Sequence, residues 1–305
     1  MGSAMKRLLV VYNLKSSRFK DVEREVLVNL RNLNGYMIGK YEIQRIGVNK
    51  NAEQFAKLVE DGDLVLSVGG DATAVISANG IIKSGKDAKL AVLPYGNFND
   101  LARTLGAKKL DDVFKGKTRK MWPLEILVDG KHFRYATCYV TIGMTAEAVE
   151  LFDDSKVRKK LQKGHKSSWR SYFSLMKWYF KNRHKKVFLP EFKLNGKLMH
   201  KKTSDYAAVN GRKMCRVMKG NECFLTPKTF RHMTGKLVNL WNLTKLMTRS
   251  ILVRVPGRDT TGDVLEFVKP STVEVQAEGE YQVFTNISKI EIRKSDKPLK
   301  VVMKK

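Results

Sequence analysis

The chain has 305 residues, of which 43% are hydrophobic, so it can form two domains of ordinary size and does not have the composition of a disordered protein. Lys and Arg outnumber Asp and Glu by 58 to 30, and the resulting formal charge of +28 indicates a polyanionic partner such as an anionic membrane or a nucleic acid. Three cysteines without a C-x-x-C pair argue against a disulfide framework and a zinc site, and no apolar run approaches the ~20 residues of a membrane span.

The first 121 residues alternate between strand-like and helix-like patterns. Residues 6–12 are a short apolar strand, and apolar residues then recur at helical spacing from Phe19 to Leu33. Three further strands are expected at 41–46, 64–68 and 89–93, followed by helices that begin near Asn51, at Thr73 and near Asn99. This order predicts a parallel sheet covered by helices on both faces.

Strand-like segments past Trp122 come in close succession. Asp129-Gly130 and Asn195-Gly196 are two-residue turn signals of the kind that join antiparallel strands. The expected strands lie at 124–128, 133–142, 187–194, 236–241, 251–255, 264–268, 272–276, 281–285 and 287–293. They predict an antiparallel, β-sandwich-like domain or a partly open barrel at 122–294, with a basic helical insertion at about 145–185. A final strand within 295–305 is expected to return to the first domain.

Two strands of the first domain are followed by loops that contain glycine. The strand at 64–68 is followed by Gly69-Gly70-Asp71, and the strand at 89–93 by Pro94-Tyr95-Gly96. Both loops open helices, so they are expected to lie side by side at the carboxyl edge of the sheet, where open α/β sheets bind ligands. Their backbone N–H groups and the first turns of the two helices would suit a phosphate. Either loop alone is more often a tight turn.

Taken together, GGDAT at 69–73 and P-x-G-x-x-N-D-L-A-R at 94–103 resemble the catalytic domain of diacylglycerol kinases and of their sphingosine kinase and bacterial lipid kinase relatives. The family pattern is GGDGT followed by P-x-G-T-x-N-D-x-A-R. YNLKSS at 12–17 lies where the family has N-P-x-S-G, and AEGE at 277–280 lies where it has D-G-E. NAD kinases share GGDGT but lack the second motif, which favours the lipid kinases.

This resemblance implies an ATP- and Mg²⁺-dependent kinase of diacylglycerol or a related lipid. It implies an NAD kinase-like nucleotide domain at 1–121 and a lipid-binding domain at 122–294. By similarity, Glu278 is implied to be the catalytic base, and Asp71, also catalytic, is implied to organise Mg²⁺ through water together with Asp100. The residues implied to line the nucleotide are Asn13, Gly69, Gly70, Thr73, Gly96, Asn97 and Asn99, with Glu280 orienting the site.

Four positions depart from the family pattern. Ala72 replaces a glycine, Asn97 replaces a threonine, and Phe98 is bulky near the expected phosphate. Glu278 replaces an aspartate and lengthens the base by about 1.5 Å, a misplacement that can cost about a hundredfold in rate. The loop at 231–236 lacks the acidic pair that would form a second metal site. A catalytically weak or inactive relative that binds lipid or nucleotide therefore stays open as the alternative.

Much of the positive charge lies in one segment. Residues 156–202 contain sixteen Lys or Arg and a single acidic residue, Glu191. Aromatic residues recur there at three- and four-residue intervals, which is typical of a helix in a membrane interface. The same spacing also fits an aromatic stripe that packs on the β domain while the lysines face solvent. We expect a cytoplasmic protein that associates peripherally with an anionic membrane. No nucleic-acid motif is present, so a nucleic-acid-binding protein is a more distant alternative. The oligomeric state is open, with a homodimer as one alternative.

Overall fold

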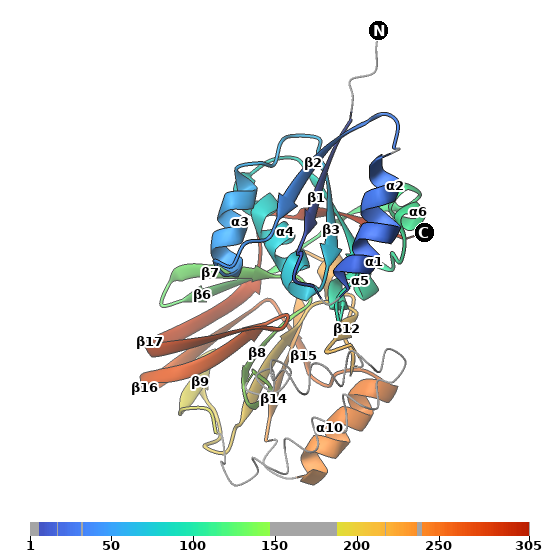
Figure 1. The fold of residues 1–305 in the computed structure, drawn as a ribbon. Coiled ribbons are helices and arrows are strands. Elements are labelled where there is room, and N and C mark those ends of the chain that lie inside the picture. The colour runs from blue at the N-terminus through green and yellow to red at the C-terminus, as the bar shows by residue number, and fades with distance from the viewer. Residues whose placement is uncertain are drawn as a thin grey trace. The chain divides into compact units, whose positions relative to one another are not determined.

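The computed structural model describes residues 6–16, 18–31, 33–146, 188–216, 218–236 and 240–304, and Figure 1 shows the fold. The chain divides into two compact units, one of Met1–Pro123 with Ser295–Lys305 and one of Leu124–Lys294. The expected helical insertion, from residue 147 onward, and the basic segment up to residue 187 lie outside the described residues. Among the described helices, none has the length and apolar character needed to cross a bilayer.

The described part of the first unit is built on a six-stranded sheet with the order β2-β1-β3-β4-β18-β5. Its strands are β1 (Lys6–Tyr12), β2 (Tyr36–Glu42), β3 (Leu64–Gly69), β4 (Lys89–Pro94), β5 (Lys117–Met121) and β18 (Leu299–Met303). All neighbours are parallel except β5, which pairs antiparallel with β18. The last strand thus lies inside the sheet, and the chain re-enters this unit at Ser295, whose N–H donates to the Pro123 carbonyl at 2.9 Å.

Helices cover this sheet because its central strands are apolar on both sides. They are α1 (Phe19–Val22), a π-helical turn (Glu23–Leu27), α2 (Val28–Arg31), α3 (Val48–Ala56), α4 (Asp71–Ser84), α5 (Asp100–Leu105) and α6 (Leu110–Phe114). Leu8 and Val10 of β1, Leu66 of β3 and Leu93 of β4 form one core with Val26 beneath the first helices. The predicted parallel α/β domain is confirmed.

The described part of the second unit is dominated by a large antiparallel sheet with the path β15-β14-β11-β8-β16-β17-β6-β7. Its strands are β6 (Leu124–Val128), β7 (Lys131–Ala136), β8 (Tyr139–Gly143), β9 (Phe192–Leu194), β10 (Lys197–Leu198), β11 (Asp205–Val209), β14 (Phe230–Gly235), β15 (Arg258–Thr260), β16 (Gly262–Ala277) and β17 (Glu280–Lys294). The remaining elements are the small hairpin β12 (Lys213–Met214) and β13 (Met218–Lys219), a 3₁₀ turn (Cys223–Leu225) and α10 (Leu240–Leu252). The predicted antiparallel β-rich domain is confirmed.

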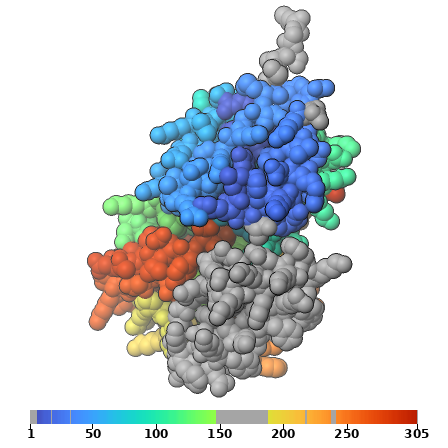
Figure 2. All heavy atoms as spheres, viewed as in Figure 1, coloured from blue at the N-terminus to red at the C-terminus, as the bar shows by residue number. Residues whose placement is uncertain are grey.

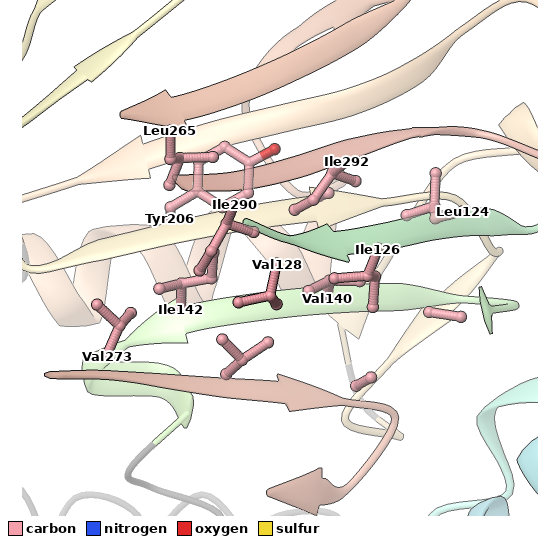
Figure 3. Close-up of a cluster of buried hydrophobic side chains, with 14 of the residues drawn as sticks. Leu124, Ile126, Val128, Val140, Ile142, Tyr206, Leu265, Val273, Ile290 and Ile292 are labelled. Carbon is pink, nitrogen blue, oxygen red and sulfur yellow. The ribbon is translucent and has the colours of Figure 1, made fainter. Parts of the chain in front are cut away.

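Strand β16 joins two parts of this sheet. Its first half pairs with β9, opposing Leu265 to Leu194, and its second half pairs with β8, opposing Val275 to Ile142. Irregular pairing with β17 around Ser271 lets the long hairpin bend between these partners. In the space-filling view the residues of β16 and β17, coloured red, form one continuous surface (Figure 2). Apolar side chains from β6, β8, β11, β16 and β17 meet in the core (Figure 3).

Several predicted strand boundaries in the second unit are wrong. Residues 240–241 of one expected strand (236–241) and residues 251–252 of another (251–255) belong to α10 instead, because Leu243 and Met247 recur at helical spacing and are buried. Short apolar runs do not distinguish a strand from a buried helix. The segment expected at 133–142 is two strands, β7 and β8, separated by Thr137 and Cys138.

Other differences have similar causes. The four strands expected between 264 and 293 merge into β16 and β17, since bulges rather than turns interrupt their pattern. The strand expected at 187–194 is reduced to β9, and the one expected at 41–46 is β2, which begins at Tyr36 and is only partly buried at the sheet edge. Strands β5, β11, β12, β13, β14 and β15 were not predicted. Of these, β5 is a charged edge strand without apolar alternation.

Candidate functional site

The two glycine loops of the first unit pack against each other through their backbones. A Cβ atom added to Gly96 would lie 2.2 Å from the Gly70 Cα, and one added to Gly69 would lie 2.4 Å from the Thr73 Oγ1. Both approaches are far inside van der Waals contact. The first one joins the two backbones, so only glycine at position 96 lets the loops after β3 and β4 come this close. Thr73 itself is buried beneath Gly69.

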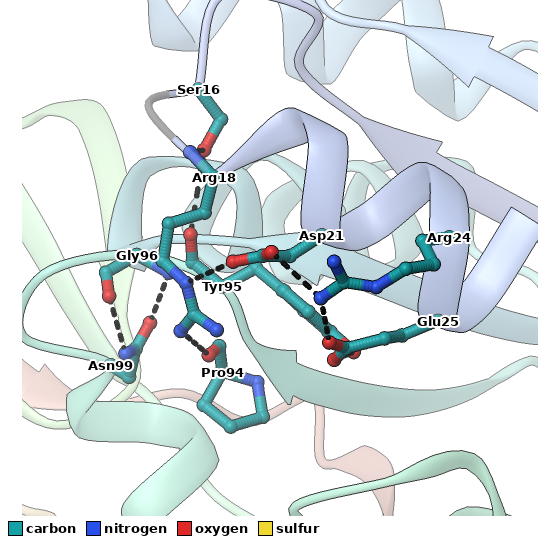
Figure 4. Close-up of polar contacts among 9 residues, drawn as sticks. All are labelled: Ser16, Arg18, Asp21, Arg24, Glu25, Pro94, Tyr95, Gly96 and Asn99. Atoms are coloured by element: carbon teal, nitrogen blue, oxygen red, sulfur yellow. Dashed lines mark hydrogen bonds and ion pairs between the residues drawn. The ribbon is translucent and has the colours of Figure 1, made fainter.

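Asp71 and Asn99 hold the two loops together. The Gly96 N–H donates to the Asn99 Oδ1 at 2.7 Å and the Asn99 Nδ2 donates to the Gly96 carbonyl at 2.7 Å, as Figure 4 shows. The two carboxylate oxygens of Asp71 accept the backbone N–H groups of Asn99, at 2.9 Å, and Asp100, at 2.7 Å. Burial raises the pKa of Asp71, and these backbone donors oppose the rise. The N–H groups at the start of α5 therefore have acceptors within the protein, unlike the sequence expectation that they face a ligand.

The N-terminus of α4 is different. Gly70 is its N-cap residue and no side chain of the described residues caps it there, whereas Ser, Thr, Asp or Asn would normally do so. This 14-residue helix begins beside Gly70 and Ala72, which are both partly exposed. A helix N-terminus with glycine at the cap position is a suitable site for a phosphate.

A loop with a cationic side chain borders the same region. Arg18 donates from Nη1 to the Pro94 carbonyl at 3.2 Å and its guanidinium lies 5.2 Å from the centre of the Tyr95 ring. Burial raises the pKa of Tyr95 to about 12, and its hydroxyl donates to Glu25 at 3.0 Å. Figure 4 shows this arrangement. Sequence reasoning missed Arg18, because no motif marks a single basic residue after a loop.

The loop before Arg18 carries Asn13. The Asn13 Oδ1 accepts the Lys15 N–H at 2.9 Å, and its carbonyl accepts the Ser16 N–H at 3.0 Å. The Ser16 hydroxyl in turn donates to the Tyr95 carbonyl at 3.4 Å. Asn13 thus shapes a turn that contacts the second glycine loop, and Asn97 is partly exposed in that loop.

The carboxylates of the first unit fit Mg²⁺ only through intervening waters. Among the described residues, no group of three or more His, Cys, Asp or Glu side chains could hold a metal ion. Both oxygens of Asp71 already accept backbone N–H groups. Its negative charge beside the α4 N-terminus would repel a phosphate unless a cation lay between them, and Mg²⁺ commonly binds protein through one or two carboxylates while it keeps waters and phosphate oxygens.

In the second unit, Glu278 lies in the turn between β16 and β17. Its φ of 54° and the φ of 89° at Gly279 give a two-residue hairpin turn with two left-handed residues. Glutamate is unusual in that conformation, which costs on the order of 1 kcal/mol. The side chain is 3% exposed, and its Oε1 accepts both the Thr137 hydroxyl, at 2.5 Å, and the Cys138 N–H.

A buried polar network supports the turn that holds Glu278. The Asn210 Nδ2 donates to the Thr137 carbonyl at 2.8 Å, and the Lys294 Nζ donates to the Asn210 Oδ1 and, at 2.6 Å, to the Cys223 carbonyl. Burial lowers the pKa of Lys294 to about 7. Sequence reasoning missed this network because its members come from segments far apart in the chain.

Glu280 is the other predicted site residue of the second unit. The negative charge of Glu280 stabilises the guanidinium of Arg134, which is 6% exposed, and the charge of Glu278 does so to a smaller extent. Burial lowers the pKa of Arg134 and the two carboxylates oppose that shift. The predicted residues therefore fall into two groups, one around the glycine loops and one around the β16–β17 turn.

The fold of this chain has a counterpart among solved structures. A solved structure of a diacylglycerol kinase from Bacillus anthracis strain Sterne superposes on 99% of this chain and 98% of its own length, with a TM-score of 0.67 at 16% sequence identity. At that identity the likeness shows the fold alone.

Sequence comparison finds similar proteins for the N-terminal part of the chain. Residues 7–126 match the diacylglycerol kinase catalytic domain. Over 123 residues the chain is 32% identical to the diacylglycerol kinase of Staphylococcus carnosus and 30% identical to that of Staphylococcus aureus. This part of the chain is similar to the diacylglycerol kinase catalytic domain. The match spans 38% of this chain and 40% and 38% of those relatives.

Proposed function

We propose that the protein is an ATP-dependent lipid kinase that phosphorylates the hydroxyl of diacylglycerol or a related lipid at a membrane surface. The observation that carries this proposal is the backbone contact between Gly70 and Gly96 beside the α4 N-terminus, within the residues that match the kinase domain. The names of the relatives support the choice of a lipid substrate.

The first unit would bind the nucleotide. The helix dipole of α4 would attract the phosphates. Arg18, which is 28% exposed, lies on the neighbouring loop with its guanidinium paired to Asp21 at 3.0 Å, so its positive charge is partly neutralised there. Mg²⁺, held through water by Asp71 and Asp100, would neutralise the charge that develops on the phosphoryl group. Asn99 and Asp71 would keep the two loops in a fixed position, so the phosphate site needs little rearrangement when a nucleotide binds.

Glu278 would accept the proton of the lipid hydroxyl. Thr137 and Cys138 hold its carboxylate in one orientation, and a fixed base is what proton transfer requires. We place the enzyme on the cytoplasmic face of an anionic membrane, where the basic segment 156–202 would add affinity for the lipid surface.

The experiment compares Glu278→Gln with wild type for phosphatidate formed from labelled ATP, Mg²⁺ and dispersed diacylglycerol. The variant is expected to lose at least about a hundredfold in rate, because the amide cannot accept the proton. Glu278→Asp, which carries the family's residue, is expected to keep measurable activity. Glu266→Gln, an exposed position on the preceding strand β16, is the control and should match wild type.

A second candidate is a relative that binds nucleotide or lipid without turnover. The burial of Glu278 and the use of both Asp71 oxygens by backbone donors favour it. Nucleotide binding by wild type without phosphatidate formation would support this candidate over the kinase.

A further inference from the structure

The most exposed large apolar side chains of the described residues gather at one place. Trp241 is 74% exposed, Leu252 66% and Val253 65%, and they belong to α10 and the residue that follows it. Figure 1 shows α10 in orange, in the second unit. Leu243 and Met247 on the same helix are 5% exposed and account for its packing. The packing of α10 therefore does not depend on the exposed side chains of Trp241, Leu252 and Val253.

These exposed residues share one face of the helix. At about 100° per residue, Trp241, Lys245, Thr248 and Leu252 fall within a stripe about 60° wide, opposite the buried Leu243. The outward face thus presents an aromatic side chain near one end, an aliphatic one near the other and a cation between them.

The backbone at both ends of α10 is fixed. The Lys219 Nζ donates to the Leu252 carbonyl at 2.7 Å, and the Val255 N–H donates to the Lys219 carbonyl at 2.8 Å. Near the N-terminus, the Asn242 Nδ2 donates to the Lys236 carbonyl at 2.9 Å. Leu252 and Val253 are exposed from an anchored segment, which lowers the entropy cost of binding a partner.

The segment that contains α10 is basic. Residues 223–258 contain no Asp or Glu and seven basic residues, which are Lys228, Arg231, Lys236, Lys245, Arg249, Arg254 and Arg258, and Arg231 among them pairs with Asp259 at 2.9 Å. Cations on the same helix as exposed Trp and Leu, as Lys245 and Arg249 are here, are typical of a helix in the interface of an anionic membrane. A nucleic acid would use the cations but not Leu252 and Val253, and the centre of a protein interface is depleted in lysine.

We propose that the outward face of α10, together with Leu252 and Val253, docks on an anionic lipid surface. This inference deepens the proposed function, since it names the surface through which the enzyme reaches a lipid substrate. It concerns residues distinct from the basic segment 156–202.

The test measures binding to phosphatidylcholine vesicles with and without phosphatidylglycerol by co-sedimentation. Trp241→Ala with Leu252→Ala should weaken binding to the anionic vesicles about tenfold or more, because two inserted apolar side chains are lost. The matched control is Leu198→Ala with Val268→Ala, which removes side chains that are 53% and 52% exposed in the same unit. The control should change binding less than about twofold.

Two further readouts make the outcome decisive. Brominated lipids should quench wild-type fluorescence more than that of Trp241→Phe, and Lys245→Glu with Arg249→Glu should abolish the preference for anionic vesicles. Unchanged binding by the Trp241/Leu252 variant, no binding by wild type, or a preference for RNA over vesicles would each overturn the proposal. Phosphate transfer by wild type to short-chain diacylglycerol in detergent tests the proposed function separately, so either idea can fail alone.

Discussion

Replacing the buried lysine beneath the β16–β17 turn should change how stability depends on pH. Lys294 is 6% exposed, and burial lowers its pKa from 10.5 to about 7. Lys294→Met keeps the length of the side chain and removes the group that titrates. The fold disfavours the charged ammonium, which below pH 7 is present in both the folded and the unfolded chain.

The magnitude follows from the two pKa values. Their difference of about 3.5 corresponds to about 5 kcal/mol of unfolding free energy. Between pH 7 and 10.5 the unfolded chain holds a proton that the folded chain has released, so stability rises with pH in that window. From pH 7 to pH 9 the gain should be about 2 kcal/mol.

Urea denaturation at pH 6, 7, 8 and 9 measures this slope. The free energy of unfolding of wild type, minus that of Lys294→Met, should increase with pH from 7 to 9. Cys223, whose burial raises its pKa, contributes in both proteins and largely cancels in the difference. Lys297→Met, at an exposed position nearby, is the control and should run parallel to wild type. Parallel curves for wild type and Lys294→Met would refute the reasoning.

Three further substitutions test the glycine loops. Gly96→Ala should destabilise the first unit by about 2 kcal/mol or more and weaken ATP binding in titration calorimetry, because its Cβ would meet the Gly70 backbone; Gly262→Ala, whose Cβ would meet nothing closer than 3.8 Å, should be tolerated. Asp71→Asn should lower the free energy of unfolding by about 1–3 kcal/mol in chemical denaturation, because the amide can accept only one of the two backbone N–H groups. A stability equal to wild type would exclude a role for Asp71 in holding the two loops together. Tyr95→Phe should cost about 1 kcal/mol, and absorbance titration should lose one tyrosine that ionises near pH 12.

The sequence predicts the first unit well because its strands are apolar and short. Strands β3 and β4 have few exposed residues, and a glycine loop follows each of them, so both the sheet and the position of its loops follow from local patterns. Strand β5 escapes prediction because four of its five residues are exposed and its pairing with β18 joins segments far apart in sequence.

The second unit is predicted less well for a physical reason. Its hairpins are interrupted by bulges, and the interval around α10 mixes apolar and basic residues in a pattern compatible with a strand or a helix. At the candidate site, motifs locate Asp71 and Glu278 but not Lys294 or Asn210. Those two residues meet through tertiary contacts between distant segments, and no sequence spacing records such a contact.

The position of β18 has a consequence for biosynthesis. The strand lies between β4 and β5, yet it is translated only after the whole second unit. A nascent chain therefore has the complete sequence of the later unit before the earlier one receives its missing interior strand. Until then the edge of β4 lacks its neighbour and is open to pairing with other chains, so cells that translate this protein slowly should depend on chaperones that shield that edge.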